Sequence, residues 1–247
     1  MDNVNDIFFE GYYKDIWRTL IPEELTSKEV DFMIPFFKLG PDSKVLDLMC
    51  GYGRHALGLA KKGIPVTAVD NLPAYINEIK AIAEKEQLPV KPVAQNVIEY
   101  NSNDIYDLVI CMGNSLNFFN ADNTSKILAT ISSHLKPGGH LLINSWSIAE
   151  IAFKSFKEKT WGTVGELKFL TDSKILFHPT RMETESIVIA PDGTTEKKLG
   201  IDYIFSINEL ETMLKTAGLE LQEVYSIPGK KKFTIGEPRA YIVVKKK

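Results

Sequence analysis

The sequence predicts an α/β protein built on a doubly wound, mostly parallel β-sheet. Between residues 44 and 145, five apolar segments alternate with segments of helical periodicity. The apolar segments are continuous runs, which is typical of strands that helices bury on both faces. The chain has 247 residues, of which 44% are hydrophobic and 25% charged. One core domain with a small insert fits this length and composition.

Two amphipathic helices are expected before the first strand. Residues 8–20 place aromatic and aliphatic side chains at helical spacing, and residues 27–38 repeat the pattern. Thr26 and Glu29 have the spacing of a capping box, so we expect the second helix to begin at Thr26. The Gly40–Pro41 pair then ends it.

The alternating region resolves into five strands and three helices. The strands are expected over residues 44–49, 64–69, 90–94, 106–112 and 140–145, and the helices over residues 54–62, 73–87 and 124–135. Right-handed crossovers between parallel strands place such helices on both faces of the sheet.

The pattern changes near residue 147. β-prone segments at residues 174–177, 186–190 and 200–205, with a turn signal at 191–194, predict antiparallel hairpins. A capping box at Ser206 and Glu209 then opens a helix that Gly218 ends. Two last strands, 219–227 and 239–244, are expected to form a hairpin that brings the main sheet to seven strands.

We therefore expect three parts in this chain. Residues 1–40 would form a helical lid segment, residues 41–146 with 206–247 the core, and residues 147–205 a small antiparallel β insert that acts as a cap.

Composition excludes several classes of function. The net charge is −3, with no basic field for nucleic acid, and no apolar run reaches the ~20 residues of a membrane-spanning helix. The first residues lack the pattern of a secretory signal. Two cysteines make neither a disulfide framework nor a four-cysteine zinc site. We expect a cytoplasmic protein without a metal.

The strongest local signal is a strand, two glycines and a helix start. Gly51 and Gly53 follow the first strand, and Asp47 lies near its end. Asp70 ends the second strand, 19 residues after Gly51. In doubly wound sheets, an acid at this place accepts hydrogen bonds from both hydroxyls of a ribose. Because Gly51–Ala56 also fits a Gly-x-Gly-x-x-Ala fingerprint, a nicotinamide-dependent oxidoreductase is one alternative.

Four motifs together resemble the class I S-adenosylmethionine-dependent methyltransferases of the small-molecule type. VLDLMCGYGRHALGLAKKG resembles the family's first motif and VTAVDNLPAYI its second, while YDLVICMGNSLNFF and LKPGGHLLINSW resemble its fourth- and fifth-strand motifs. They cover residues 44–146 in the family's order, and residues 206–247 resemble its last helix and antiparallel strand pair. The insert resembles that of the sugar-amine and glycine N-methyltransferase-like group. The resemblance implies a Rossmann-like fold with an antiparallel last strand.

The resemblance also implies cofactor-binding residues for S-adenosyl-L-methionine and its product S-adenosyl-L-homocysteine. Asp47 would hold the amino group, Asp70 the ribose hydroxyls, and the third-strand loop the adenine amino group. The set is Asp47, Cys50, Gly51, Gly53, Asp70, Asn71, Leu72, Asn96, Val97, Cys111 and Met112. One departure is Met49, which stands where the family has its first glycine.

Candidates near the transferred methyl group are fewer. Asn114 and Ser115 follow the fourth strand, His55 lies in the first turn of a helix, and Tyr12 belongs to the aromatic lid segment. The absence of prolines around Asn114 is unlike adenine-modifying relatives. We expect transfer to a nitrogen or oxygen of a small-molecule acceptor, with no nucleic-acid or membrane partner, by a monomer or homodimer. A non-catalytic S-adenosylmethionine-binding protein is the second alternative.

Overall fold

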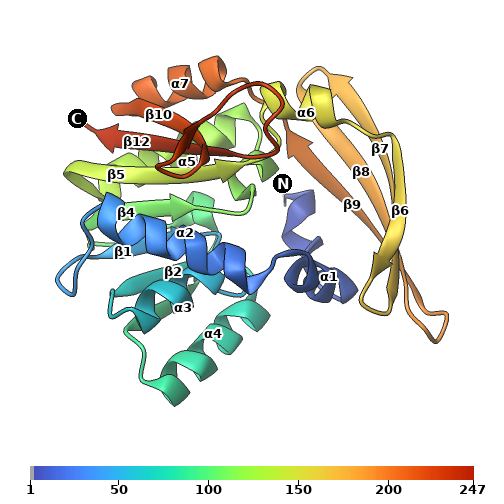
Figure 1. Ribbon diagram of the computed structural model, residues 1–247, viewed down its shortest axis with the longest axis horizontal. Coiled ribbons are helices and arrows are strands. Elements are labelled where there is room, and N and C mark those ends of the chain that lie inside the picture. The colour runs from blue at the N-terminus through green and yellow to red at the C-terminus, as the bar shows by residue number, and fades with distance from the viewer. Residues whose placement is uncertain (1–2) are drawn as a thin grey trace.

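A large sheet and a small one, connected by helices, make up the computed structural model, which describes residues 3–247 (Figure 1). The large sheet has the strand order β11-β10-β12-β5-β4-β1-β2-β3. Its strands are β1 (Val45–Leu48), β2 (Val66–Asp70), β3 (Val90–Ala94), β4 (Tyr106–Cys111), β5 (Leu135–Ser145), β10 (Leu219–Ile227), β11 (Lys231–Lys232) and β12 (Ala240–Lys246).

Strands β1 to β5 are parallel, and β12 runs antiparallel to both β5 and β10. This confirms the predicted mostly parallel sheet with an antiparallel last strand. The predicted number of seven strands is wrong, because β11 adds an eighth at the edge beside β10. Two lysines carry no apolar pattern, so sequence periodicity could not show this strand.

Helices cover both faces of the large sheet and enclose two apolar clusters. On one face, α2 (Glu23–Phe36), α3 (Arg54–Lys61) and α4 (Pro73–Glu86) pack over a cluster that includes Val30, Leu59 and Ile79. On the other face, α5 (Ala121–His134) and α7 (Ile207–Thr216) pack over a cluster that includes Ile127 and Leu214. β1 is buried along its whole length, as its continuous apolar run predicts.

Three predicted helix starts are wrong, and one is that of α5, which begins at Ala121 and not at residue 124 because the Asn120 side chain caps it. The first helix, α1 (Tyr12–Leu20), begins four residues late, because Gly11 has a φ of 62° and separates it from a 3-10 helix over Val4–Ile7. Helix α2 begins at Glu23 behind Pro22, so Thr26 and Glu29 lie inside the helix and make no capping box. Proline fixes its own φ and favours a helix start, which outweighs the capping pattern further along.

The small sheet is antiparallel and has the order β6-β7-β8-β9. Its strands are β6 (Lys159–Val164), β7 (Leu167–Phe177), β8 (Thr180–Ile189) and β9 (Thr195–Tyr203), and α6 (Ala149–Ser155) leads into them. The predicted hairpins and the turn at residues 191–194 are confirmed. Figure 1 shows this sheet curving away from the core, with α1 in the space between them. No helix in residues 3–247 has the length and apolar composition to cross a bilayer.

Candidate active site

The turn between β1 and α3 has three residues in the left-handed region. Met49, Gly51 and Gly53 have φ values of 57°, 56° and 78°. A Cβ on Gly53 would lie 2.6 Å from Ile79, whereas a Cβ on Gly51 would meet nothing within 4 Å. Gly53 therefore permits the close packing of α3 on α4, and Gly51 leaves open space. Met49 adopts a conformation that costs an L-residue about 1–2 kcal/mol, which is strain of the kind found at functional sites.

A cavity opens at the carboxyl ends of β1, β2 and β4, the edge at which doubly wound sheets bind ligands. We call it the strand-edge cavity. It has about 790 Å³ of empty space, part of which is open to solvent. The structure brings these predicted site residues to its wall: Asp47, Cys50, Gly51, His55, Asp70, Asn71, Leu72, Met112 and Ser115.

The other predicted cofactor residues lie around this cavity. Asn96 and Val97 line an adjoining recess that shares Met49 and Asp70 with it. Cys111 is fully buried in β4, and Gly53 lies behind the wall at the start of α3.

Asp70 connects the two loops at this edge. Its Oδ2 accepts a hydrogen bond from the Gly51 amide at 2.8 Å, and its Oδ1 accepts one from the Leu72 amide at 3.0 Å. Burial raises the pKa of this carboxyl. Because each carboxylate oxygen has a second lone pair, Asp70 can also accept bonds from a ligand's hydroxyl groups.

Two buried atoms of charged side chains in the strand-edge cavity have no partner among the described residues. One is Oδ2 of Asp47, a side chain only 1% exposed, and the other is Nη2 of Arg54. Burial raises the pKa of Asp47 to about 7, against the opposing effect of the Arg54 charge. Unsatisfied buried groups of opposite charge are costly in the free protein. They suit a ligand that carries both an ammonium and a carboxylate group.

Arg54 is held in place by Glu29, a buried acid on α2. Oε2 of Glu29 lies 2.6 Å from Nη1 of Arg54 and 2.8 Å from Nε2 of His55, and Oε1 accepts a bond from the Tyr241 hydroxyl at 2.7 Å. Burial and the Arg54 charge lower the pKa of His55 to about 4, so His55 is neutral at pH 7. The ring proposed from sequence as a base is thus engaged with Glu29.

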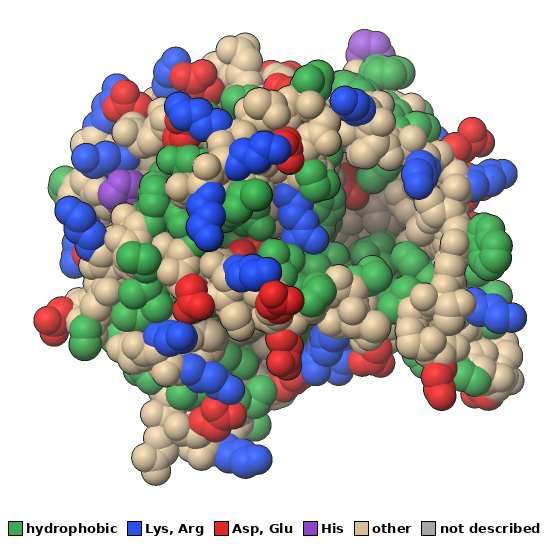
Figure 2. Space-filling model, in the orientation of Figure 1, with side chains coloured by type: hydrophobic (Ala, Val, Ile, Leu, Met, Phe, Trp, Pro, Cys, Tyr) green, Lys and Arg blue, Asp and Glu red, His purple; other side chains and the backbone are tan. Residues whose placement is uncertain are grey.

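A second cavity, which we call the intersheet cavity, lies between the small sheet and the core. It has about 1130 Å³ of empty space, and Figure 2 shows it as a hollow with hydrophobic side chains on its walls. Alternate residues of the small sheet face it, as the two-residue period of a strand requires. They include Phe169, Thr171 and Ser173 of β7, Met182, Thr184 and Ser186 of β8, and Gly200 and Asp202 of β9.

Asn114 joins the core to the small sheet. It is 1% exposed, has a φ of 68°, and its Oδ1 accepts bonds from Ser145 Oγ and from the amides of Trp146 and Ser147. Its Nδ2 donates to Asp202 Oδ1 at 2.7 Å. Asn114 therefore positions an acid that sequence reasoning did not find.

Ser115, next in sequence to Asn114, faces the other cavity. Its buried Oγ lines the strand-edge cavity and has no partner among the described residues. The two candidates after β4 thus face different cavities.

Aromatic side chains of the N-terminal segment form the shared wall of the two cavities. Phe9 and Trp17 line both cavities, together with Phe118 of the 3-10 helix Ser115–Phe118 that follows β4. Tyr12 is half-buried and lines neither, whereas its neighbour Tyr13 lines the intersheet cavity. Helical periodicity found the aromatic stripe but could not tell which tyrosine faces the site.

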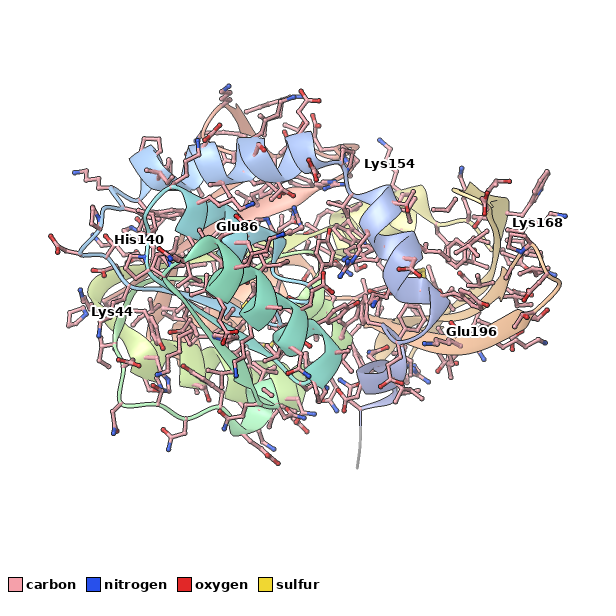
Figure 3. All side chains as sticks on the ribbon, turned by 90° about the horizontal axis from the view of Figure 1, so that it is seen from below. Lys44, Glu86, His140, Lys154, Lys168 and Glu196 are labelled. Atoms are coloured by element: carbon pink, nitrogen blue, oxygen red, sulfur yellow. The ribbon has the colours of Figure 1, made fainter. Side chains whose placement is uncertain are left out.

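Figure 3 shows where several titratable side chains outside the two cavity linings lie. His140 and Lys44 lie at one end of the molecule, and Lys168 and Glu196 of the small sheet lie at the other. His140 is therefore far from the intersheet cavity.

Asn5 fixes the N-terminal segment to both neighbouring elements. Its Nδ2 donates to the carbonyls of Phe118 and Ile201, and its Oδ1 accepts from the Ile201 amide at 2.9 Å. We expect Asn5→Ala to destabilise the protein by about 2 kcal/mol, because each lost bond contributes about 0.5–1.5 kcal/mol. Urea denaturation measures this, with the exposed Asn103→Ala as control. Equal stability of the two variants would show that these bonds contribute nothing.

Comparisons with known proteins indicate the family and the fold that this chain resembles. Residues 45–139 match the family model described as a methyltransferase domain. Hemagglutinin 1 of Eikenella corrodens is 36% identical over 102 residues, which are 41% of this chain and 34% of that protein. Glycine/sarcosine N-methyltransferase of Aphanothece halophytica is 28% identical over 163 residues, 64% of this chain and 61% of that protein.

The fold matches solved structures over almost its whole length. An S-adenosylmethionine-dependent methyltransferase from Clostridium acetobutylicum superposes with a TM-score of 0.80 at 20% identity, over 95% of this chain and 96% of that one. The chain spans about 34–42% of the length of the first curated relatives that it matches. The predicted resemblance is confirmed: residues 45–139 match the family model of a methyltransferase domain, and the chain shares its fold with solved S-adenosylmethionine-dependent methyltransferases.

Proposed function

We propose that the protein is an S-adenosylmethionine-dependent methyltransferase that acts on a nitrogen or oxygen of a small molecule. The observation that carries this proposal is the pair of unpartnered atoms, Asp47 Oδ2 and Arg54 Nη2, in the cavity of the matched domain. The ammonium and carboxylate groups of the cofactor's methionine moiety would be partners for these two atoms. A nicotinamide cofactor does not carry an ammonium group next to a carboxylate group. The two unpartnered atoms therefore favour a methyltransferase over an oxidoreductase.

The remaining predicted residues suit the rest of the cofactor. Asp70 would accept the ribose hydroxyls, and the open space at Gly51 would let the ligand approach the backbone beside Cys50. Asn71 and Leu72 would flank the adenine, and the recess at Asn96 and Val97 would receive its amino group. Met112 would line the floor above the buried Cys111. These assignments follow the family's motif positions.

The cofactor's sulfonium supplies an activated methyl group and its leaving group, so the chain's own residues act by placement. Phe9, Trp17 and Phe118 form the common wall of the two cavities. Excluding water and aligning the acceptor are the principal contributions that such a site makes. Ser115 lines the strand-edge cavity and Asn114 lines the intersheet cavity, so these neighbouring residues lie where the two cavities adjoin. This position supports their assignment near the transferred methyl group.

The division into a lid (residues 1–40), a core (41–146 and 206–247) and a cap (147–205) belongs to the same proposal. The small sheet would cover the acceptor, since its inner face lines the intersheet cavity. We propose a cytoplasmic enzyme that works as a monomer or homodimer. Sedimentation velocity tests the assembly state.

Calorimetric titration tests the cofactor. We expect micromolar binding of S-adenosylmethionine and S-adenosylhomocysteine, and no binding of NAD or NADP. Binding of a nicotinamide cofactor alone would contradict the proposal. Cofactor binding without methylation of any amine, amino sugar or phenol would favour the non-catalytic alternative.

Asp70→Ala is expected to weaken S-adenosylhomocysteine binding about 30-fold. The variant loses the acceptor of the ribose hydroxyls and the bonds that hold Gly51 and Leu72. Such charge-assisted bonds contribute about 2 kcal/mol to binding, which corresponds to this factor. Calorimetry measures it, with the exposed Asp122→Ala as control. Unchanged affinity would remove Asp70 from the ribose site.

A further inference from the structure

We infer that the methyl acceptor is an amine, and that Asp202 binds it as an ammonium ion and receives the proton that its nitrogen loses. The inference rests on the proposed function and concerns the intersheet cavity. It selects nitrogen over oxygen as the methylated atom.

The first observation is the unused oxygen of Asp202. Oδ1 accepts both recorded hydrogen bonds, from Asn114 Nδ2 at 2.7 Å and from Ser147 Oγ at 3.3 Å. Oδ2 accepts none from residues 3–247, and no lysine or arginine among them pairs with this carboxylate. Asp202 lies on the inner face of β9, so its accessible part faces the cavity. Hydrogen bonds to Oδ1 therefore hold the carboxylate in place, and Oδ2 is available to a ligand in the cavity.

The second observation is the character of the cavity around Asp202. It is the one carboxylate among the described lining residues, and Lys157, exposed on the segment after α6, is the one cation. Rings of Tyr13, Trp17 and Trp146 line the same space. A carboxylate among aromatic faces binds a cation both by charge and through the negative faces of the rings. A neutral hydroxyl group would leave the carboxylate without a counter-charge.

The third observation is the position of Asp202 between the two cavities. Asn114, which holds it, directly follows Met112 and Gly113 of the strand-edge cavity. Trp17 lines both cavities. An ammonium group bound at Oδ2 therefore lies in the compartment that adjoins the proposed cofactor site.

The chemistry balances with Asp202 as the proton acceptor. The ammonium ion gives one proton to the carboxylate, and the freed nitrogen lone pair forms the bond to the methyl carbon. The carbon–sulfur bond breaks and its electron pair stays on sulfur, so the products are an N-methylammonium ion and S-adenosylhomocysteine. Asp202 then returns its proton to water. Burial raises the pKa of Asp202 to about 6, which leaves it ionised at pH 7.5 yet more basic than an exposed aspartate. Burial also raises the pKa of Tyr13, which stays neutral.

Two isosteric probes test the charge preference directly. Benzylammonium and benzyl alcohol differ by one charge, and Trp17 and Trp146 line the cavity, so their fluorescence can report binding. At pH 7.5 we expect benzylammonium to bind at least tenfold more tightly, with and without S-adenosylhomocysteine present. Asp202→Asn should remove that preference and Glu185→Gln, an exposed acid of β8, should keep it.

The readouts separate this inference from the proposed function. Calorimetry on the same samples measures S-adenosylhomocysteine binding, which tests the proposed function. The ratio of the affinities for benzylammonium and benzyl alcohol tests the role of Asp202 separately. With an amine that the wild type methylates as acceptor, Asp202→Asn should also lose turnover while retaining cofactor affinity. Equal affinity of the two probes, binding of neither, or an unchanged preference in Asp202→Asn would overturn the inference. Thermal denaturation confirms that the variants are folded.

Discussion

Asp47→Asn is expected to stabilise the free protein while weakening its binding of S-adenosylmethionine about a hundredfold. The wild-type carboxyl is 1% exposed and its Oδ2 has no partner among the described residues. Loss of one member of a buried charge pair costs about 2–5 kcal/mol, and about 3 kcal/mol corresponds to the expected loss of affinity. The same side chain thus opposes folding and favours binding.

The stability gain should depend on pH. The pKa of Asp47 is about 7 in the folded chain against 3.8 ordinarily, so its carboxyl favours the folded state below pH 3.8 and loses that contribution as the pH rises through 7. Above pH 7 the ionised Asp47 costs the wild-type folded state about 4 kcal/mol, a cost that Asp47→Asn avoids. The asparagine amide has no partner at this position, and this costs the variant about 1–3 kcal/mol. We expect a net gain of about 2 kcal/mol at pH 8 that shrinks as the pH falls and becomes a net loss of about 1 kcal/mol near pH 4, where the amide cost remains and the ionisation penalty is nearly gone.

Urea denaturation at pH 4 and pH 8 measures this gain, and Asp42→Asn, in the exposed turn before β1, is the control. Calorimetry provides a second readout. An ammonium group at Asp47 lowers its pKa, so wild-type binding near pH 6.5 should release protons and its enthalpy should depend on the buffer. Asp47→Asn should show no such dependence. A variant that is less stable at pH 8 and binds the cofactor normally would contradict the assignment.

Sequence predicted the parts of the molecule that depend on neighbouring residues. The buried strand at residues 45–48, the glycine turn and Asp70 follow one another within about two dozen positions, and local pattern was enough to place them together. The capping box at Ser206 and Glu209 is also local and is confirmed. The strand-edge cavity could be predicted because the carboxyl ends of parallel strands meet at one edge.

The intersheet cavity depends on contacts that no local pattern encodes. Asn114 and Asp202 are 88 residues apart in the sequence. The residues around Asp202 in β9 have the pattern of a strand with exposed polar side chains, so nothing local marks this acid. Glu29 and Tyr241 are 212 residues apart. The spacing of Thr26 and Glu29 predicted a capping box, so the sequence analysis assigned Glu29 to a helix start and not to the contact between α2, α3 and β12. In both cases sequence alone could not distinguish an acid that lies inside the molecule from an acid on its surface.

Glu29→Ala is expected to cause the largest loss of stability, about 3–5 kcal/mol. Glu29 is 2% exposed and contacts Arg54, His55 and Tyr241, and its removal leaves the Arg54 charge buried without compensation. Glu24→Ala, on the same helix but exposed, is the matched control and should change stability by less than about 0.5 kcal/mol. Urea denaturation at pH 7 measures both.

Acid pH gives the Glu29 prediction a second signature. Its hydrogen bonds to His55 and Tyr241 and the Arg54 charge overcome burial and lower the pKa of Glu29 from 4.5 to about 2. A lowered carboxyl pKa stabilises the folded state above pH 4.5, and that contribution is lost as the pH falls from 4.5 to 2. The difference between wild type and Glu29→Ala should therefore shrink over this range. A difference below 1 kcal/mol at pH 7, or one that stays constant down to pH 2.5, would show that the cluster does not carry the junction of α2, α3 and β12. Because Glu29 also holds Arg54, the variant should bind S-adenosylhomocysteine more weakly, which Glu24→Ala should not.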